Sequence, residues 1–400
     1  MTPIGIPAIG PDPLSAADLL NRRVRATRHE PGEDPRFEAL ALAVTANLPV
    51  LLWGEPGIGK SSAVERLAAG LRVPLETVIA GVHDPSGATG LPATGGRPAR
   101  SGGSTAPPDW AVRLAEAGSG LVLLDELSCA SSAAQAALLR VVLERRVGGL
   151  ALPETVRVVA AASQPSGGDG RHLSPPLANR FVHLRWTHDP RTVARGMAGT
   201  WPSLRIPLTD PDKIPGAVAR ARGAISGFLS ARPDLSHRLP DDPGSRGGAW
   251  PSPRTWEMVL RLLTTAHATG TGGEALALAV TGTVGDGAGA ELISYLDRLG
   301  LPDPDQVLAH PDAFALPERG DRQLAFLTSV VAAVQGDLTR RRWEAGWTVL
   351  AKAVDAGAPD VAAQAAADLA ALRHTDWAVP GGIDAFLDLL RLTGALPGGR

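Results

Sequence analysis

A glycine-rich segment at residues 54–61 has the residue types and spacing of a phosphate-binding loop. It reads Gly-Glu-Pro-Gly-Ile-Gly-Lys-Ser and matches G-x-x-x-x-G-K-[ST] without a gap. Glycines permit a loop whose backbone N–H groups face inward, and a following helix N-terminus adds positive potential. We expect Lys60 to contact the β- and γ-phosphates of ATP and the Ser61 hydroxyl to bind Mg²⁺. The residues predicted to hold the nucleotide are Gly54, Glu55, Pro56, Gly57, Ile58, Gly59, Lys60, Ser61 and Ser62.

Two adjacent carboxylates end a hydrophobic run further along the chain. The run at 121–124 is followed by Asp125 and Glu126, and parallel α/β sheets bind ligands at the carboxyl ends of their strands. Asp125 is expected to hold Mg²⁺ through water, together with Ser61. Glu126 is expected to orient and activate the attacking water, a role in which a general base contributes about 10²–10⁴-fold. A kinase of small molecules would not need the second carboxylate, whereas an ATP hydrolase does.

These motifs lie in a part of the chain where predicted strands and helices alternate. Short apolar runs predict buried strands, and apolar residues at helical spacing predict helices. Such alternation indicates an α/β fold, with a parallel sheet that helices cover on both faces. The predicted strands are 49–53, 75–80, 121–124, 156–162 and 182–184, and the predicted helices are 37–44, 64–71, 110–117 and 134–142.

The pattern changes near residue 200, after which only helices are predicted. Pro- and Gly-rich stretches predict a loop at 235–251 and a connector at 301–320. The predicted helices are 214–229, 256–263, 275–280, 343–354, 361–371 and 383–390. We therefore divide the chain into an N-terminal tail (1–35), an α/β core (36–203), an all-helical lid (204–300) and a helical C-terminal extension (301–400).

Composition excludes several classes of protein. The chain has 39 basic and 41 acidic residues, so a nucleic-acid-binding protein or motor is disfavoured. We interpret the three arginines at 340–342 as a solvated helix face. The single cysteine, Cys129, excludes intramolecular disulfides and a multi-cysteine metal site. No apolar run approaches the roughly 20 residues of a membrane span, and the N-terminus lacks a signal-peptide pattern. We therefore expect a cytoplasmic protein without membrane contact.

Six segments in order along the chain carry a resemblance to a known family. They are GEPGIGKSS (54–62), DPSGATGLP (84–92), APPDWAVRLAEAGSGLVLLDELS (106–128), AAQAALLRVVLERR (133–146), LSPPLANRF (173–181) and SPRTWEMVLRLL (252–263). Together they resemble the MoxR-like branch of the AAA+ ATPases, the dynein-related group of P-loop NTPases. The resemblance implies a five-stranded core, ATP bound between the core and a helical lid, and a homo-oligomeric ring of six subunits. It also implies a chaperone-like ATPase that remodels or activates a client protein, often beside a von Willebrand factor A-domain protein.

The resemblance assigns roles to two arginines. Arg180 matches the arginine finger, which reaches into the neighbouring subunit's site and neutralises charge on the γ-phosphate. The alternative is an arginine that caps the helix before strand 182–184. Arg254 matches the lid arginine called sensor 2, and the alternative is an exposed arginine at a helix start. A cation in the first turn opposes the helix dipole, which favours a special role for Arg254.

One position departs from the family's pattern. The family usually has an asparagine after the fourth strand, where it positions the attacking water. Here Ser163 or Gln164 takes that place, depending on the register. Glutamine can donate and accept as asparagine does, whereas serine reaches less far. Hydrolysis is therefore expected to be slow or to depend on a partner. An alternative function follows, a slow-hydrolysing nucleotide-dependent switch or scaffold that assembles on binding ATP.

A second segment matches an insertion that faces the ring pore in relatives. Residues 81–108 are rich in glycine and contain no aromatic residue with which to grip a peptide. We interpret this segment as a flexible contact loop, and a disordered surface loop is an equal alternative.

Overall fold

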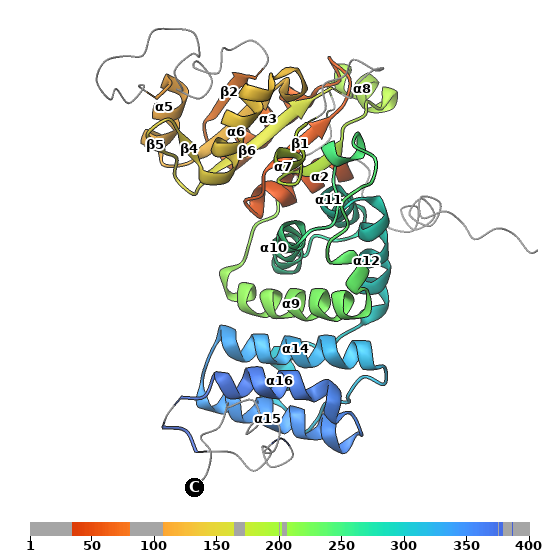
Figure 1. Ribbon diagram of the computed structural model, residues 1–400. Coiled ribbons are helices and arrows are strands. Elements are labelled where there is room, and N and C mark those ends of the chain that lie inside the picture. The colour runs from red at the N-terminus through yellow and green to blue at the C-terminus, as the bar shows by residue number, and fades with distance from the viewer. Residues whose placement is uncertain are drawn as a thin grey trace, which may run out of the picture.

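The computed structural model describes residues 34–80, 107–163, 173–199, 201, 206–374, 376–378 and 386. An α/β layer, a layer of helices and a C-terminal group of helices follow one another along the long axis of the molecule (Figure 1). The predicted insertion at 81–108 lies outside the described residues except for its last two. The predicted tail at 1–35 lies outside them except for residues 34 and 35.

A five-stranded parallel sheet forms the α/β layer. Its strand order is β2-β3-β6-β1-β7, and every pairing is parallel. The strands are β1 (Val50–Trp53), β2 (Leu75–Ile79), β3 (Gly120–Asp125), β6 (Val156–Ala162) and β7 (Val182–Arg185). This confirms the α/β prediction and all five predicted strands. Because β6 lies between β1 and β3, the segments that follow these three strands emerge side by side at one edge.

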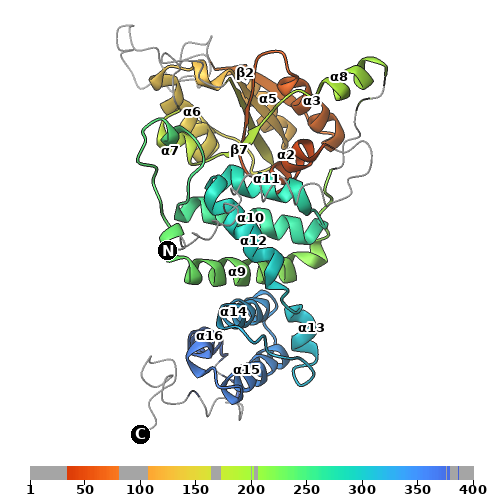
Figure 2. The ribbon, with the colours of Figure 1, turned by 90° about the vertical axis from the view of Figure 1, so that its right-hand side faces the viewer.

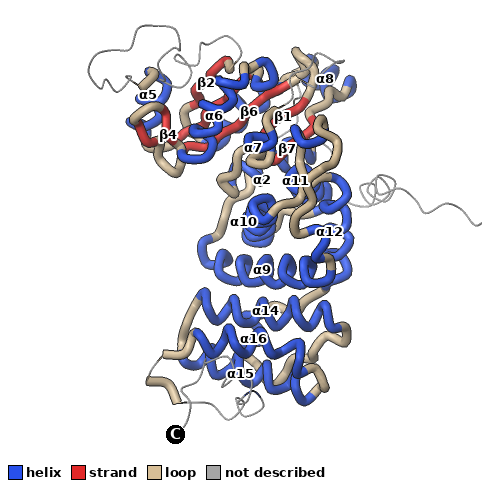
Figure 3. The backbone as a smooth tube through the Cα atoms, viewed as in Figure 1, coloured by secondary structure: helices blue, strands red, loops and turns tan. Residues whose placement is uncertain are grey.

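Helices cover both faces of the sheet, as Figure 3 shows. Neighbouring residues of one strand enter opposite hydrophobic clusters, because side chains alternate along a strand. Leu52 packs in the cluster with α2 and α3, whereas Leu51 packs in the cluster with α5 and α6. The helices are α2 (Pro35–Thr45), α3 (Lys60–Leu71), α5 (Asp109–Ala117) and α6 (Ser132–Glu144), all four of which were predicted.

Short elements in this layer were not predicted, except for the helix before β7 that the alternative for Arg180 assumes. A hairpin of β4 (Arg146–Val147) and β5 (Leu150–Ala151) turns through Gly148 at a φ of 58°. A glycine pair between two strands is a known hairpin signal, but strands of two residues are too short to show a period. The other short elements are α7 (Pro175–Ala178) and α8 (Pro190–Met197).

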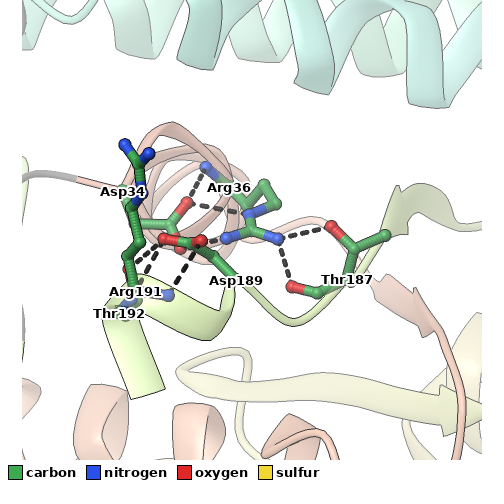
Figure 4. Close-up of polar contacts among 6 residues, drawn as sticks. All are labelled: Asp34, Arg36, Thr187, Asp189, Arg191 and Thr192. Atoms are coloured by element: carbon green, nitrogen blue, oxygen red, sulfur yellow. Dashed lines mark hydrogen bonds and ion pairs between the residues drawn. The ribbon is translucent and has the colours of Figure 1, made fainter. Parts of the chain in front are cut away.

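A polar cluster ties α2 to the segment between β7 and α8 (Figure 4). The Arg36 guanidinium donates to both carboxylate oxygens of Asp34, the N-cap of α2, and to the carbonyl and hydroxyl of Thr187. Asp189 caps α8 by accepting from the backbone N–H of Arg191 and Thr192. The hydrogen bond from the Thr192 hydroxyl, together with these two, lowers the pKa of Asp189. The start of α2 and the start of α8 are therefore held together beside the sheet.

The lid helices pack directly on the α/β layer. They are α9 (Ile214–Ala231), α10 (Pro253–Thr269), α11 (Gly273–Val284) and α12 (Asp286–Leu299). Met258 and Leu262 of α10 and Ala275 of α11 belong to the same hydrophobic cluster as α2 and β7. Figure 2 shows α11 beneath α2 and β7, in agreement with their packing contacts. One continuous core thus joins the sheet to the lid, and the domain boundaries at 203 and 300 stay a prediction.

The C-terminal helices form a separate hydrophobic cluster around Trp343 and Trp347, both fully buried. They are α13 (Pro304–Ala309), α14 (Gly320–Gly336), α15 (Arg340–Asp355) and α16 (Pro359–Ala371). The connector predicted at 301–320 therefore contains a helix, α13, and the helix predicted at 383–390 lies outside the described residues except for Phe386. Within the described part of the chain, no helix is long and apolar enough to cross a membrane.

The interpretation of residues 340–342 as a solvated face needs a correction. Arg340 and Arg341 are exposed, but the Arg342 guanidinium donates to the Asp305 carboxylate at 2.5 Å and to the Ala333 carbonyl at 3.0 Å. Arg342 therefore joins α15 to α13 and α14. The sequence could not show this contact because Asp305 is far from Arg342 along the chain.

Gly282 offers a test of the contact between lid and sheet. A Cβ on Gly282 of α11 would lie against the His183 carbonyl of β7, with the carbonyl carbon at 3.0 Å. Gly282→Ala should therefore lower the free energy of unfolding by about 1–3 kcal/mol, as overpacking does. Gly287→Ala on α12 is the matched control, because a Cβ there meets no atom of a described residue within 4 Å. Chemical denaturation measures the free energy of unfolding of the two variants, and equal values would contradict the close contact.

Candidate nucleotide-binding site

A cleft of about 310 Å³ lies at the carboxyl edge of the sheet. The loop after β1, the first turn of α3, and the ends of β3 and β6 line it. The structure therefore brings together the glycine-rich loop and the two carboxylates that the sequence singled out. The lining residues are Pro56, Gly57, Gly59, Lys60, Ser61, Ser62, Asp125, Glu126, Ala161, Ala162 and Ser163.

Glycines at two positions allow the loop to take its course. Gly57 and Gly59 have φ angles of 78° and 93°, in the left-handed region where side chains are strained. Gly59 is also the N-cap of α3 and offers no side-chain oxygen to the first turn. The first backbone N–H groups of a helix have no partner within the helix, so those of α3 can bind an anion.

Gly54 and Ile58 support the loop from behind. A Cβ on Gly54 would lie against the Trp186 carbonyl and 2.5 Å from the Ile58 side chain. Trp186 in turn donates its backbone N–H to the Trp53 carbonyl at 2.6 Å and packs edge-on against Phe37. The polar cluster of Figure 4 therefore lies next to the segment that backs the loop. Gly54, Glu55 and Ile58 are the predicted loop residues that do not line the cleft.

Lys60 bonds to the loop itself. Its ammonium donates to the Gly54 carbonyl at 2.7 Å and to the Glu55 carbonyl at 2.9 Å. Burial lowers the pKa of Lys60, and the nearby charges of Asp125 and Glu126 oppose this shift. The ammonium is thus a partly desolvated cation held at the cleft by two neutral acceptors. A phosphate oxygen is a stronger, charged acceptor for the same protons.

Ser61 and Asp125 meet across the cleft. The Ser61 hydroxyl donates to Asp125 Oδ2 at 3.1 Å, while Asp125 Oδ1 accepts the Glu126 backbone N–H at 2.9 Å. These two side chains offer oxygen ligands next to the loop. Mg²⁺ prefers oxygen ligands and is commonly bound by one or two carboxylates plus the phosphates of a substrate. The residues present therefore fit a magnesium ion.

Glu126 has an unusual backbone conformation. Its φ of 56° and ψ of 38° are left-handed, which costs a non-glycine residue about 1–3 kcal/mol. The turn is held because the Glu126 carbonyl accepts the Cys129 N–H at 2.9 Å and the Leu127 side chain is fully buried. The exposed Glu126 carboxylate lines the cleft. Strain of this kind gathers at functional sites, and no sequence pattern announced it.

Ser163 directly follows β6 and lines the cleft. Because β6 lies between β1 and β3, Ser163 is placed between the phosphate-binding loop and the two carboxylates. Its backbone N–H donates to the Ser128 hydroxyl at 3.3 Å, which ties it to the turn after Glu126. Gln164, the other residue considered for this position, lies outside the described residues.

Arg180 and Arg254 do not line the cleft, and they lie near enough for the charge of Arg254 to act on Arg180. Arg180 lies two residues before β7, so it is at the opposite end of that strand from the cleft. Burial lowers the pKa of Arg180, and the charge of Arg254 lowers it further. Arg180 Nη1 donates to the Pro176 carbonyl of α7, the capping contact of the alternative interpretation. Its Nε is buried and has no hydrogen-bond partner among the described residues.

Three buried polar residues near this pair were not singled out from the sequence. Asn179 precedes Arg180, and Ser252 and Thr255 flank Arg254. Ser252 followed by a proline carries an N-cap signal, and it indeed caps α10. Asn179 has no comparable pattern, because its partners come from a distant part of the chain.

Comparisons with known proteins support one family. Residues 49–181 match the family model of the AAA domain, dynein-related subfamily. No curated protein matches the chain.

Three solved structures are similar at low identity. A putative ATPase from Cytophaga hutchinsonii is 14% identical, with 70% of this chain and 84% of that chain covered and a TM-score of 0.39. A full-length MCM homolog from Methanopyrus kandleri is 20% identical, with 72% of this chain and 62% of that chain covered and a TM-score of 0.34. NtrX from Brucella abortus in complex with ADP is 16% identical, with 86% of this chain and 72% of that chain covered and a TM-score of 0.29. At these values they carry no argument about function.

The matched segment runs from the residue before β1 to the residue before β7 and contains the loop, both carboxylates and Arg180. Together with the strand order and the cleft, it identifies residues 49–181 as an AAA domain of the dynein-related subfamily.

Proposed function

We propose that this protein hydrolyses Mg²⁺-bound ATP in the cleft at the carboxyl edge of the sheet. The observation that supports this most is the convergence on one cleft of Lys60 and Ser61, from the start of α3, with Asp125 and Glu126, from the end of β3. An ammonium, a hydroxyl, a metal-binding carboxylate and a second carboxylate are the groups that phosphoryl transfer to water needs.

The loop and α3 would bind the phosphates. The uncapped N–H groups at the start of α3 face the position of the phosphates, and Lys60 exchanges its two carbonyl acceptors for phosphate oxygens. Ser61 and Asp125 would hold Mg²⁺, which supplies charge neutralisation at the phosphate oxygens. The Ser61–Asp125 contact already holds both oxygen ligands together at 3.1 Å.

Glu126 would act on the attacking water. Its carboxylate is exposed at the cleft, and its strained backbone is held by the turn that follows. A carboxylate so placed can orient a water molecule and accept its proton as the bond to phosphorus forms.

A second candidate function is a nucleotide-dependent switch or scaffold that hydrolyses ATP slowly. Ser163 favours it, because this short hydroxyl side chain lines the cleft where the family usually has an asparagine. A serine holds the water less firmly than an asparagine, since it is shorter and offers one donor. The steady-state ATPase rate, measured with and without a partner protein, separates the two functions.

The active unit is proposed to be a homo-oligomeric ring of six subunits. Arg180 lies at the amino end of β7, about 13 Å of strand away from the carboxyl edge of its own sheet. Such a position suits an arginine that completes a neighbour's site. The remodelling of a client protein in the cytoplasm, with a von Willebrand factor A-domain partner, is carried over from the resemblance to MoxR-like proteins.

Two substitutions separate ATP binding from hydrolysis. Glu126→Gln should retain ATP binding and lower turnover by about 10²–10⁴-fold, because the amide cannot accept the proton of the water. Lys60→Ala should abolish ATP binding, because it removes the ammonium from the loop. Glu65→Gln is the matched control, an exposed carboxylate on α3 that does not line the cleft. Fluorescent-nucleotide binding and phosphate release measure the two steps, and normal turnover by Glu126→Gln would remove its proposed role.

Mixed rings test whether Arg180 serves a neighbour. Arg180→Ala and Lys60→Ala chains should each be inactive alone, since a finger supplied in trans contributes about 10³–10⁵ in kcat. In mixed oligomers an intact loop meets an intact Arg180 on the next chain, so ATPase activity should return.

Mixing Arg254→Ala chains with Lys60→Ala chains applies the same test to the lid arginine. Recovery would show that Arg254 serves the neighbour's nucleotide, and no recovery would show that it serves its own. Oligomers must be shown to be mixed, for example by pull-down on a tag carried by one chain. If the Arg180→Ala mixture stays inactive, or a dilute monomer is fully active, Arg180 is not a finger in trans.

A further inference from the structure

A buried polar network connects the segment that carries Arg180 to the helix that carries Arg254. The Asn179 amide donates to the Trp250 carbonyl at 3.2 Å, and Asn179 Oδ1 accepts the Ser252 hydroxyl at 2.8 Å. Asn179 therefore binds one acceptor and one donor of the lid, with both ends of its side-chain amide. Its two partners lie about seventy residues away along the chain.

On the lid side, the same residues build the start of α10. The Ser252 hydroxyl accepts the Thr255 N–H at 3.2 Å, and the Thr255 hydroxyl accepts the Ser252 N–H at 2.8 Å, which makes a capping box. Arg254 lies within this first turn of α10. The orientation of that turn is therefore linked to Asn179 through Ser252.

The three side chains of the network are buried. Asn179 is 7% exposed, Ser252 is 5% exposed and Thr255 is fully buried. A buried amide must have its donors and acceptors satisfied in a defined geometry, because an unpaired polar group costs about 1–3 kcal/mol. The Asn179 side chain therefore has one favourable orientation, and this fixes the backbone from which Arg180 departs.

Arg180 itself has few anchors of its own. Its Nη1 donates to the Pro176 carbonyl, and its buried Nε has no hydrogen-bond partner among the described residues. Phe181, on its other side, is fully buried in the core. The position of the guanidinium thus depends on the Pro176 carbonyl and on the backbone at Asn179 and Phe181. Of these two flanking residues, Asn179 alone has a hydrogen bond to the lid among the residues that the structure describes.

We propose that Asn179 is a positioning residue for Arg180, and that its two hydrogen bonds to Trp250 and Ser252 hold the Arg180 segment in register with the first turn of α10. This rests on the proposed function, in which Arg180 completes an ATPase site. The lid and the arginine then move as one unit, because the network joins them more directly than the chain does. Arg180 and Arg254 are close enough for one charge to lower the other's pKa, which fits a common unit.

The network can lose Asn179 without leaving the lid residues unsatisfied. The Trp250 carbonyl also accepts the Thr255 hydroxyl at 3.1 Å, and the Ser252 hydroxyl also lies 3.2 Å from the Thr255 hydroxyl. Asn179→Ala should therefore fold and retain its capping box. This separates an effect on Arg180 from a general loss of structure.

Steady-state ATPase kinetics of the full chain test the proposal. Asn179→Ala should lower kcat by about 10²-fold, as misplacement of a catalytic group by about 1 Å can do, with KM for ATP and fluorescent-nucleotide binding unchanged. Arg180→Ala should keep a residual kcat about 10³–10⁵-fold below that of the unaltered chain. Adding Asn179→Ala should not lower this residual kcat further, since there is then no guanidinium to position. A purely structural role predicts losses that multiply in the double variant.

Two capping residues provide a matched control. Ser252→Ala removes the lid's donor to Asn179 and should lower kcat as Asn179→Ala does, while costing about 1 kcal/mol as an N-cap. Thr339→Ala removes the N-cap of α15, where the Thr339 hydroxyl accepts the Arg342 N–H, and should cost similar stability with normal kcat. Thermal unfolding measures the stability of both variants.

The outcomes distinguish this proposal from the proposed function. Normal kcat in Arg180→Ala would overturn the finger and with it any positioning role. An inactive Arg180→Ala together with a normal Asn179→Ala would overturn the positioning role alone. Equal effects of Ser252→Ala and Thr339→Ala on kcat would also overturn it, because the capping contact would then be only structural.

Discussion

The candidate site depends on the strand order of one parallel sheet. Because β6 lies between β1 and β3, three chain segments end side by side: the phosphate-binding loop, Ser163, and the pair Asp125 and Glu126. No local interaction brings Ser61 to within 3.1 Å of Asp125, since the two are distant in sequence. The sheet does so, and its buried core on both faces fixes the register. The chemistry of the cleft is therefore a consequence of non-local packing.

The same edge strand relates the cleft to the lid. β7 pairs with β1 along its length, its far end backs the loop through Trp186, and α11 packs on it at Gly282. The residue before β7 is Phe181, buried in the core, and before that come Arg180 and Asn179, which binds the lid. A displacement of the lid helices can thus be transmitted to both the loop and the Arg180 segment through these contacts.

Much of the fold and the cleft could be predicted because their signals are local. Gly54, Gly59 and Lys60 belong to one uninterrupted motif, and the five strands are short apolar runs. The left-handed Glu126, the α13 helix in the connector and the Arg342–Asp305 ion pair were not predicted. Asn179 was missed for the same reason as Arg342, because a polar residue reveals its partners only when distant segments pack. Short elements such as β4 and β5 were missed because they contain too few residues to show a period.

The most direct test is a structure of the full chain with Mg²⁺ and a non-hydrolysable ATP analogue. The β- and γ-phosphates should lie in the cleft at the first turn of α3. Lys60 Nζ should bind phosphate oxygens instead of the Gly54 and Glu55 carbonyls, and the ion should lie between Ser61 and Asp125. Phosphates bound elsewhere, or Lys60 still bonded to the two carbonyls, would contradict nucleotide binding at this site.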